Sequence, residues 1–185
     1  MLIFNVDRRQ FVLVRQFRAP VHLANLRTNP RGHPPPHPRN AFTIEICAGL
    51  ADKPGNSIPQ TAKEEVLEEC GYDVPVEALQ LVNVVRGSVG LVGNTHYYFY
   101  CEVTDAQRVG PGGGLADEDI EVLHMGVEEA VELLAKPPVP KTASLMFVGV
   151  ALALRWRVGC CEAVYPEFLT RVDPVVNPAS LWSGG

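Results

Sequence analysis

Four glutamates, Glu64, Glu65, Glu68 and Glu69, lie within six residues of this chain, and Gly71 follows them. Like charges three or four positions apart on a helix repel one another and weaken the helix by about 0.2–0.5 kcal/mol per pair. A bound cation would remove that penalty, and carboxylate oxygens are preferred ligands of hard divalent cations such as Mg²⁺. The cluster therefore indicates either a metal site or a solvated acidic face.

The residues around the glutamates predict the helix that carries them. Ser57 and Gln60 have the S-x-x-Q spacing of a capping box, and Pro59 falls in the first turn, where its missing N–H costs nothing. Gly71 suits the left-handed position just past the last turn. We therefore predict a helix from about Ile58 to Cys70.

Helical geometry brings two of the carboxylates onto one edge of this helix. At about 100° per residue, Glu65 and Glu69 lie almost above one another, whereas Glu68 points to one side. Ala62 and Val66 flank the pair and are apolar. Two carboxylates therefore share an edge of the face expected to pack on the protein.

The stretch Glu45-Ile46-Cys47-Ala48-Gly49-Leu50, together with the capped helix, resembles the Nudix signature. This signature, G-x5-E-x7-R-E-U-x-E-E-x-G-U with U aliphatic, belongs to hydrolases of nucleoside diphosphates linked to another group. Its second half is matched here by Glu65, Val66, Glu68, Glu69 and Gly71. In its first half, one residue is inserted after Gly49, Asn56 replaces the first glutamate, and Glu64 replaces the arginine that steadies the catalytic carboxylates in the family.

Flanking segments narrow the resemblance. Residues 11–18, the E-I-C-A-G-L stretch and residues 113–120 are similar to landmarks of the ADP-ribose pyrophosphatase-like Nudix enzymes. The segments C-A-G-L, E-E-C-G-Y, E-V-T-D-A-Q-R and G-P-G-G-G-L resemble the animal UDP-sugar diphosphatase branch of that group. The similarity extends from about residue 2 to residue 155.

This resemblance implies a reaction and a cofactor. It implies hydrolysis of a UDP-sugar such as UDP-glucose to UMP and a sugar 1-phosphate, with ADP-ribose as a further substrate. It implies Mg²⁺, or alternatively Mn²⁺, as the cation. Glu65 and Glu69 would be the main metal ligands, with Glu68 assisting and the Ala48 carbonyl completing the site, and Glu65 and Glu68 are also assigned to catalysis.

The resemblance also assigns residues outside the helix. Asp117, Glu118 and Asp119 occupy the loop that adds a further metal ligand and a catalytic base in related enzymes, and we predict Glu118 for both roles, against the alternative of a solvated loop. Arg18 and Glu45 match positions that line the substrate site. Arg18 would bind phosphate and Glu45 a hydroxyl. The alternatives are an arginine that covers a strand edge and a glutamate that ends a strand.

Composition agrees with a compact enzyme domain. The chain has 185 residues, 46% of them apolar and 20% charged, which suffices for one core. We expect one domain over residues 1–157 and an irregular tail over 158–185.

The net charge of -5 argues against nucleic-acid binding, and no apolar run reaches the roughly 20 residues that cross a membrane. Five cysteines without a C-x-x-C pair indicate reduced thiols and the cytoplasm.

Hydrophobic patterning predicts the remaining elements. Residues 2–6 and 10–17 should form a hairpin, residues 79–86, 95–103 and 120–125 further strands, and residues 127–135 and 142–157 helices. Residues 20–40 are rich in proline and are predicted to be a mobile loop without regular helix. Gly110–Gly114 is predicted to be a flexible lid or hairpin loop. This order suits the α/β/α sandwich with a mixed sheet of the Nudix fold.

The family's additional N-terminal strands, which build its homodimer, are expected to be missing here, so the homodimer is in doubt.

Two further functional interpretations stay open. A degenerate Nudix domain would bind nucleotide sugars without turnover. A non-enzymatic domain would use the proline-rich loop as an interaction motif.

Overall fold

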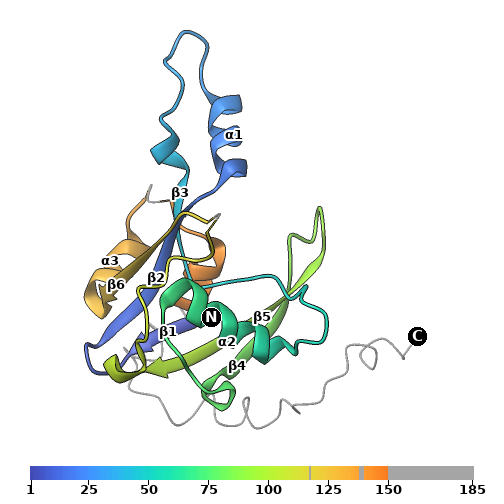
Figure 1. Ribbon diagram of the computed structural model, residues 1–185. Coiled ribbons are helices and arrows are strands. Elements are labelled where there is room, and N and C mark those ends of the chain that lie inside the picture. The colour runs from blue at the N-terminus through green and yellow to red at the C-terminus, as the bar shows by residue number, and fades with distance from the viewer. Residues whose placement is uncertain (117, 138–139, 150–185) are drawn as a thin grey trace. The chain divides into compact units, whose positions relative to one another are not determined.

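The computed structural model describes residues 1–116, 118–137 and 140–149. Its strands are β1 (Leu2–Asn5), β2 (Gln10–Phe17), β3 (Phe42–Glu45), β4 (Gln80–Gly87), β5 (Asn94–Val103) and β6 (Ile120–Gly126). Its helices are α1 (Ala19–Thr28), α2 (Ile58–Cys70) and α3 (Val127–Ala135), and residues 143–149 are also helical (Figure 1). Short 3₁₀ turns are η1 (Pro38–Ala41), η2 (Val76–Ala78) and η3 (Asp105–Gln107).

The six strands form one mixed sheet in the order β3-β2-β1-β5-β4, with β6 paired to β2. The β1–β5 pair is parallel and the other pairs are antiparallel. One edge of β2 is taken by β6 over residues 10–16, and the other edge is shared by β1 over residues 10–12 and by β3 over residues 14–17. The C-terminal end of β2 therefore lies between β3 and β6.

Helices cover both faces of this sheet. Residues 11–14 of β2 are all buried, as expected for a strand that is covered on both sides. Val12 and Val14 belong to the core cluster that contains Val66 of α2. Phe11 and Leu13 alternate with them and point to the other face, and α3 contacts β2 and β6. The predicted α/β/α sandwich is confirmed.

Most predicted elements are confirmed to within two residues. The hairpin of β1 and β2, the later strands and α3 form where the pattern indicated, and α2 spans Ile58–Cys70 as predicted. The predicted helix over residues 142–157 is described only for residues 143–149, and the predicted tail over 158–185 lies outside the described residues. Strand β3 was not predicted, because only four residues separate its start from the irregular signature loop.

The prediction that residues 20–40 lack regular helix is wrong. Helix α1 occupies Ala19–Thr28, and Pro20 lies in its first turn, where proline has no N–H to lose. The prolines that prevent helix begin only at Pro30, and the chain is irregular from there to η1. None of the residues of α1 is buried. Proline therefore prevents regular helix only from residue 30 onward.

Among the described residues, no helix combines the length and the apolar character needed to cross a membrane.

Candidate active site

Helix α2 is held at both ends by the residues that predicted it. The Ser57 side chain accepts a hydrogen bond from the Gln60 N–H (3.3 Å), and Gly71 adopts a left-handed φ of 77°. The capping box is half formed, because the Gln60 side chain donates to Glu64 (3.2 Å). The ends of α2 therefore fix which carboxylates face the loop that precedes it.

The signature loop and α2 meet at Glu69 and Glu65. The Ala48 N–H donates to Glu69 Oε2 (3.0 Å), and Glu69 is only 3% exposed. A side chain at Gly49 would place its Cβ 2.0 Å from the Glu65 carboxyl carbon, so only glycine leaves room for Glu65 there. The two predicted main ligands therefore lie against one loop.

Burial and neighbouring negative charges make these carboxylates hard to ionise. Burial, followed by the charges of Glu69 and Glu68, raises the pKa of Glu65 to about 7. Burial also raises the pKa of Glu69, although hydrogen bonds from Ala48 and Cys47 oppose the rise. An added cation would favour the ionised form of both groups.

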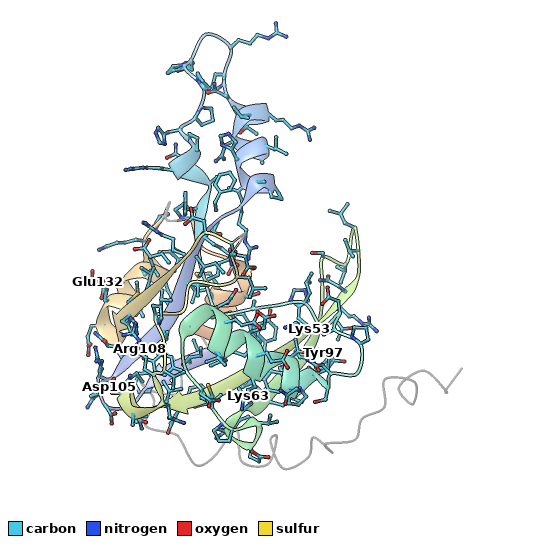
Figure 2. All side chains as sticks on the ribbon, in the orientation of Figure 1. Lys53, Lys63, Tyr97, Asp105, Arg108 and Glu132 are labelled. Carbon is cyan, nitrogen blue, oxygen red and sulfur yellow. The ribbon has the colours of Figure 1, made fainter. Side chains whose placement is uncertain are left out.

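Glu64 is held away from this pair by donors of its own. Asn56 Nδ2 donates to Glu64 Oε2 (2.9 Å), and Lys53 Nζ lies 3.1 Å from the same oxygen. Lys53 Nζ also lies 3.5 Å from Glu68 Oε1, beside α2 (Figure 2). The hydrogen bond from Gln60, then that from Lys53, lowers the pKa of Glu64. The two replaced signature positions, Asn56 and Glu64, therefore contact each other.

Arg18 and Glu45 form a bidentate ion pair at the end of β2. Arg18 Nε and Nη2 lie 2.7 and 2.8 Å from Glu45 Oε1 and Oε2, and the Thr43 hydroxyl also donates to Glu45. The hydrogen bond to Glu45, and after it the charges of Glu45, Glu69 and Glu118, raise the pKa of Arg18. The pair therefore lies in the field of the acidic cluster, and the Arg18 side chain, 41% exposed, can reach an added anion.

The acidic loop also faces this cluster. The charge of Glu118 contributes to the raised pKa of both Glu65 and Glu69. Glu118 Oε2 accepts a hydrogen bond from the Leu115 N–H (2.9 Å). Asp117 lies outside the described residues, and Asp119 is exposed. The charge of Glu118 thus reaches the α2 carboxylates.

The donor set fits a magnesium-like cation. Among the described residues, no group of three or more His, Cys, Asp or Glu side chains is arranged to hold a metal by itself. Mg²⁺ does not require such a group, because it keeps several waters and binds through one or two carboxylates together with substrate phosphates. Glu65 and Glu69 could supply that pair of carboxylates. The structure shows the Ala48 N–H rather than its carbonyl at Glu69, so the carbonyl ligand stays a prediction.

Sequence reasoning missed two contributions to the site. Lys53, which bridges Glu64 and Glu68, had no signal beyond its place in the loop before the helix. The glycine-rich segment was predicted to be a lid or hairpin loop, but Gly113 and Gly114 donate to the Glu69 and Glu68 carbonyls. Four glycines in five residues were the signal for such a close backbone approach.

Other polar features lie elsewhere. A cavity of about 750 Å³ is lined by Arg15, Phe42 and Ile44, whose side chains alternate with those that face α2. Asp105, which accepts hydrogen bonds from Asn5 and Arg8, lies far from Lys53 in Figure 2. Neither feature belongs to the acidic cluster.

Comparison with known proteins identifies close relatives. The chain is 39% identical over 175 residues to the uridine diphosphate glucose pyrophosphatase NUDT14 of Bos taurus, with 86% of this chain and 77% of the relative covered. The Mus musculus protein of the same name is 38% identical, with 84% and 75% covered. The GDP-mannose pyrophosphatase of Enterobacter sp. (strain 638) is 37% identical over 135 residues, with 72% and 62% covered. No protein-family model matches the chain.

A solved structure shares the fold. The crystal structure of an ADP compounds hydrolase superimposes with a TM-score of 0.56 and covers 85% of this chain and 71% of its own. At 15% identity this likeness bears on the fold alone.

Proposed function

The chain belongs to the Nudix hydrolases, in the group of nucleotide-sugar pyrophosphatases, and from that premise we propose that it cleaves the diphosphate of a UDP-sugar such as UDP-glucose. The products would be UMP and a sugar 1-phosphate, and ADP-ribose would be a further substrate. The observation that carries the proposal is the pair Glu65 and Glu69, which the signature loop holds side by side with raised pKa values.

Glu65 and Glu69 would hold the cation, which we propose to be Mg²⁺, with Mn²⁺ as a substitute. Glu68, Glu118 and the Ala48 carbonyl would complete its surroundings. When bound, the cation offsets the charge of the diphosphate and activates a water molecule. The acidic cluster supports this assignment because a buried and a partly buried carboxylate with elevated pKa values bind a cation in exchange for protons.

The remaining residues would bind and orient the substrate. Arg18 would donate to a phosphate oxygen from the outer side of its ion pair, where it is partly exposed. Glu45, which is 6% exposed, would keep the Arg18 guanidinium in place and accept from a hydroxyl only if that pair rearranged. Because Glu45 already holds Arg18 with both oxygens, its role as an Arg18 anchor is supported better than its role as a hydroxyl ligand.

Glu118 would take the proton of the attacking water. It lies on an exposed loop close enough for its charge to raise the pKa of Glu65 and Glu69. In the hydrolysis, water oxygen forms a bond to phosphorus, the bridging anhydride bond breaks, and the second phosphate leaves as the sugar 1-phosphate. No covalent enzyme intermediate is required.

The signature departures keep the loop and the helix joined, so they do not by themselves favour a degenerate binding domain. Asn56 and Lys53 donate to Glu64, so the loop and helix are joined at these positions with a carboxylate on the helix instead of an arginine. These contacts also bring Lys53 to Glu68.

We further propose that the enzyme is cytoplasmic, which is supported by the free buried thiols of Cys47, Cys70 and Cys101.

The test is a substrate panel with product identification. UDP-glucose, GDP-mannose and ADP-ribose are incubated separately with the protein and Mg²⁺, Mn²⁺ or EDTA, and nucleoside monophosphates are separated by chromatography. We expect UMP from UDP-glucose in the presence of either cation and none with EDTA. A folded protein that releases no nucleoside monophosphate from any of the three would refute the proposed function.

A further inference from the structure

We propose that the glycine segment Gly112–Gly114 positions Glu118 against the end of α2 that carries Glu68 and Glu69. This inference rests on the proposed metal site. It assigns the segment a role in assembling that site, in addition to ending the helix.

The first observation is a set of backbone hydrogen bonds between the segment and α2. The Gly113 N–H donates to the Glu69 carbonyl (2.8 Å), and the Gly114 N–H donates to the Glu68 carbonyl (3.0 Å). The last carbonyls of a helix have no partner within the helix. The segment is therefore hydrogen-bonded to the backbone of the two residues whose side chains belong to the acidic cluster.

The second observation is that two glycines have no room for a side chain. A Cβ at Gly112 would lie 2.3 Å from the Glu69 carbonyl oxygen, and a Cβ at Gly114 would lie 2.4 Å from Glu118 Oε2. Both residues have left-handed backbones, with φ of 72° and 78°. The segment is thus packed against α2 at one glycine and against Glu118 at another.

The third observation is how Glu118 is held. Its Oε2 accepts from the Leu115 N–H (2.9 Å), and its backbone N–H donates to the Leu115 carbonyl (3.0 Å). Leu115 directly follows Gly114. A chain of short contacts therefore runs from the Glu68 and Glu69 carbonyls through the glycines to the Glu118 carboxylate.

A purely structural role would not need the contact at Gly114. The helix already ends at Gly71, whose φ is 77° and whose N–H donates to the Leu67 carbonyl (3.0 Å). The space left by Gly114 is filled by Glu118 and by Ile120, not by α2. Gly114 therefore packs against Glu118 and Ile120 on its α-carbon side, while its N–H binds the Glu68 carbonyl of α2.

The test compares three alanine or asparagine variants. Gly114→Ala inserts the Cβ that meets Glu118, and Gly114→Asn inserts the same atom with a residue that tolerates left-handed backbone better. Gly110→Ala is the matched control, because its Cβ meets nothing within 4 Å and its backbone is not left-handed. Folding is checked by circular dichroism, and Mn²⁺ binding is measured by electron paramagnetic resonance without substrate.

We expect both Gly114 variants to weaken Mn²⁺ binding by about tenfold or more, as displacement of supporting groups does at other metal sites, and Gly110→Ala to match the parent. Glu118→Gln should weaken binding similarly. In the Glu118→Gln background, Gly114→Ala should cause little further loss, because both changes remove the same contribution.

Three results would overturn the inference. Mn²⁺ binding by folded Gly114→Asn equal to that of Gly110→Ala would show that the contact is unimportant. A full additional loss in the double variant would show that Gly114 acts independently of Glu118. A parent protein that binds no Mn²⁺ would remove the site itself, whereas Mn²⁺ binding without turnover would refute only the proposed function.

Discussion

Replacing Glu65 by glutamine should stabilise the protein at alkaline pH in the absence of divalent cations while abolishing turnover. Burial and the charges of Glu69 and Glu68 raise the pKa of Glu65 to about 7. The folded state therefore keeps this proton up to about pH 7, whereas the unfolded chain releases it near pH 4.5. Folding stability is lost as pH rises between these values.

The size of the effect follows from the two pKa values. The difference between about 7 and 4.5 corresponds to about 3 kcal/mol at pH 8, at 1.36 kcal/mol per pKa unit. Glu65 is only partly buried, so screening by solvent reduces this to about 1–2 kcal/mol. Glu65→Gln removes the charge and should recover that amount at pH 8 but almost nothing at pH 5.

The assay is urea unfolding at pH 5 and pH 8, each with EDTA and with Mg²⁺. Glu77→Gln, an exposed glutamate outside the cluster, is the control and should change stability little at either pH. Mg²⁺ should stabilise the parent more at pH 8 than at pH 5, because cation binding competes with protonation. Glu65→Gln should lose most of that stabilisation.

A Glu65→Gln protein that is less stable than the parent at pH 8 in EDTA would refute this reasoning. Equal gains in stability at pH 5 and pH 8 would refute it as well, because the gain would then not come from ionisation.

Three other changes test separate parts of the structure. Gly49→Ala should reduce both Mn²⁺ affinity and kcat by about tenfold or more, because its Cβ would displace the Glu65 carboxylate. The control Gly90→Ala, whose Cβ meets nothing within 4 Å, should match the parent. Asn56→Glu alone should lower the unfolding temperature, because it places two carboxylates together. Adding Glu64→Arg to this variant should restore the unfolding temperature. A double variant that is no more stable than Asn56→Glu would contradict this expectation. Tyr72→Phe should cost about 1 kcal/mol in urea unfolding through the lost hydrogen bond from Asn5, with kcat unchanged; a fall in kcat would contradict this separation of core from site.

Much of the fold could be predicted because its local signals are strong. Helix α2 has a serine before it, a proline in its first turn and a left-handed glycine after it, and each lies where the structure shows it. Strand β3 has only four residues, too few for alternation to identify it. Helix α1 buries no side chain and so carries no amphipathic pattern.

The candidate site could be predicted only in part, because its contacts join distant segments. The positions of Glu65 and Glu69 follow from helical periodicity within one element. The pairing of Arg18 with Glu45 depends on the antiparallel register of β2 and β3, in which Val14 faces Glu45. The hydrogen bond from the Gly113 N–H to the Glu69 carbonyl joins residues 44 positions apart. No spacing rule reveals such contacts.

The central claim is that Glu65 and Glu69 support cation-dependent cleavage of a nucleotide sugar. The most direct test measures UMP release from UDP-glucose with and without Mg²⁺ by the parent, by Glu69→Gln and by the Glu77→Gln control. We predict that Glu69→Gln lowers kcat by at least about 100-fold, since a catalytic cation contributes several kcal/mol, while Glu77→Gln matches the parent. Turnover by Glu69→Gln at the parent's rate, or equal turnover in EDTA, would contradict the claim.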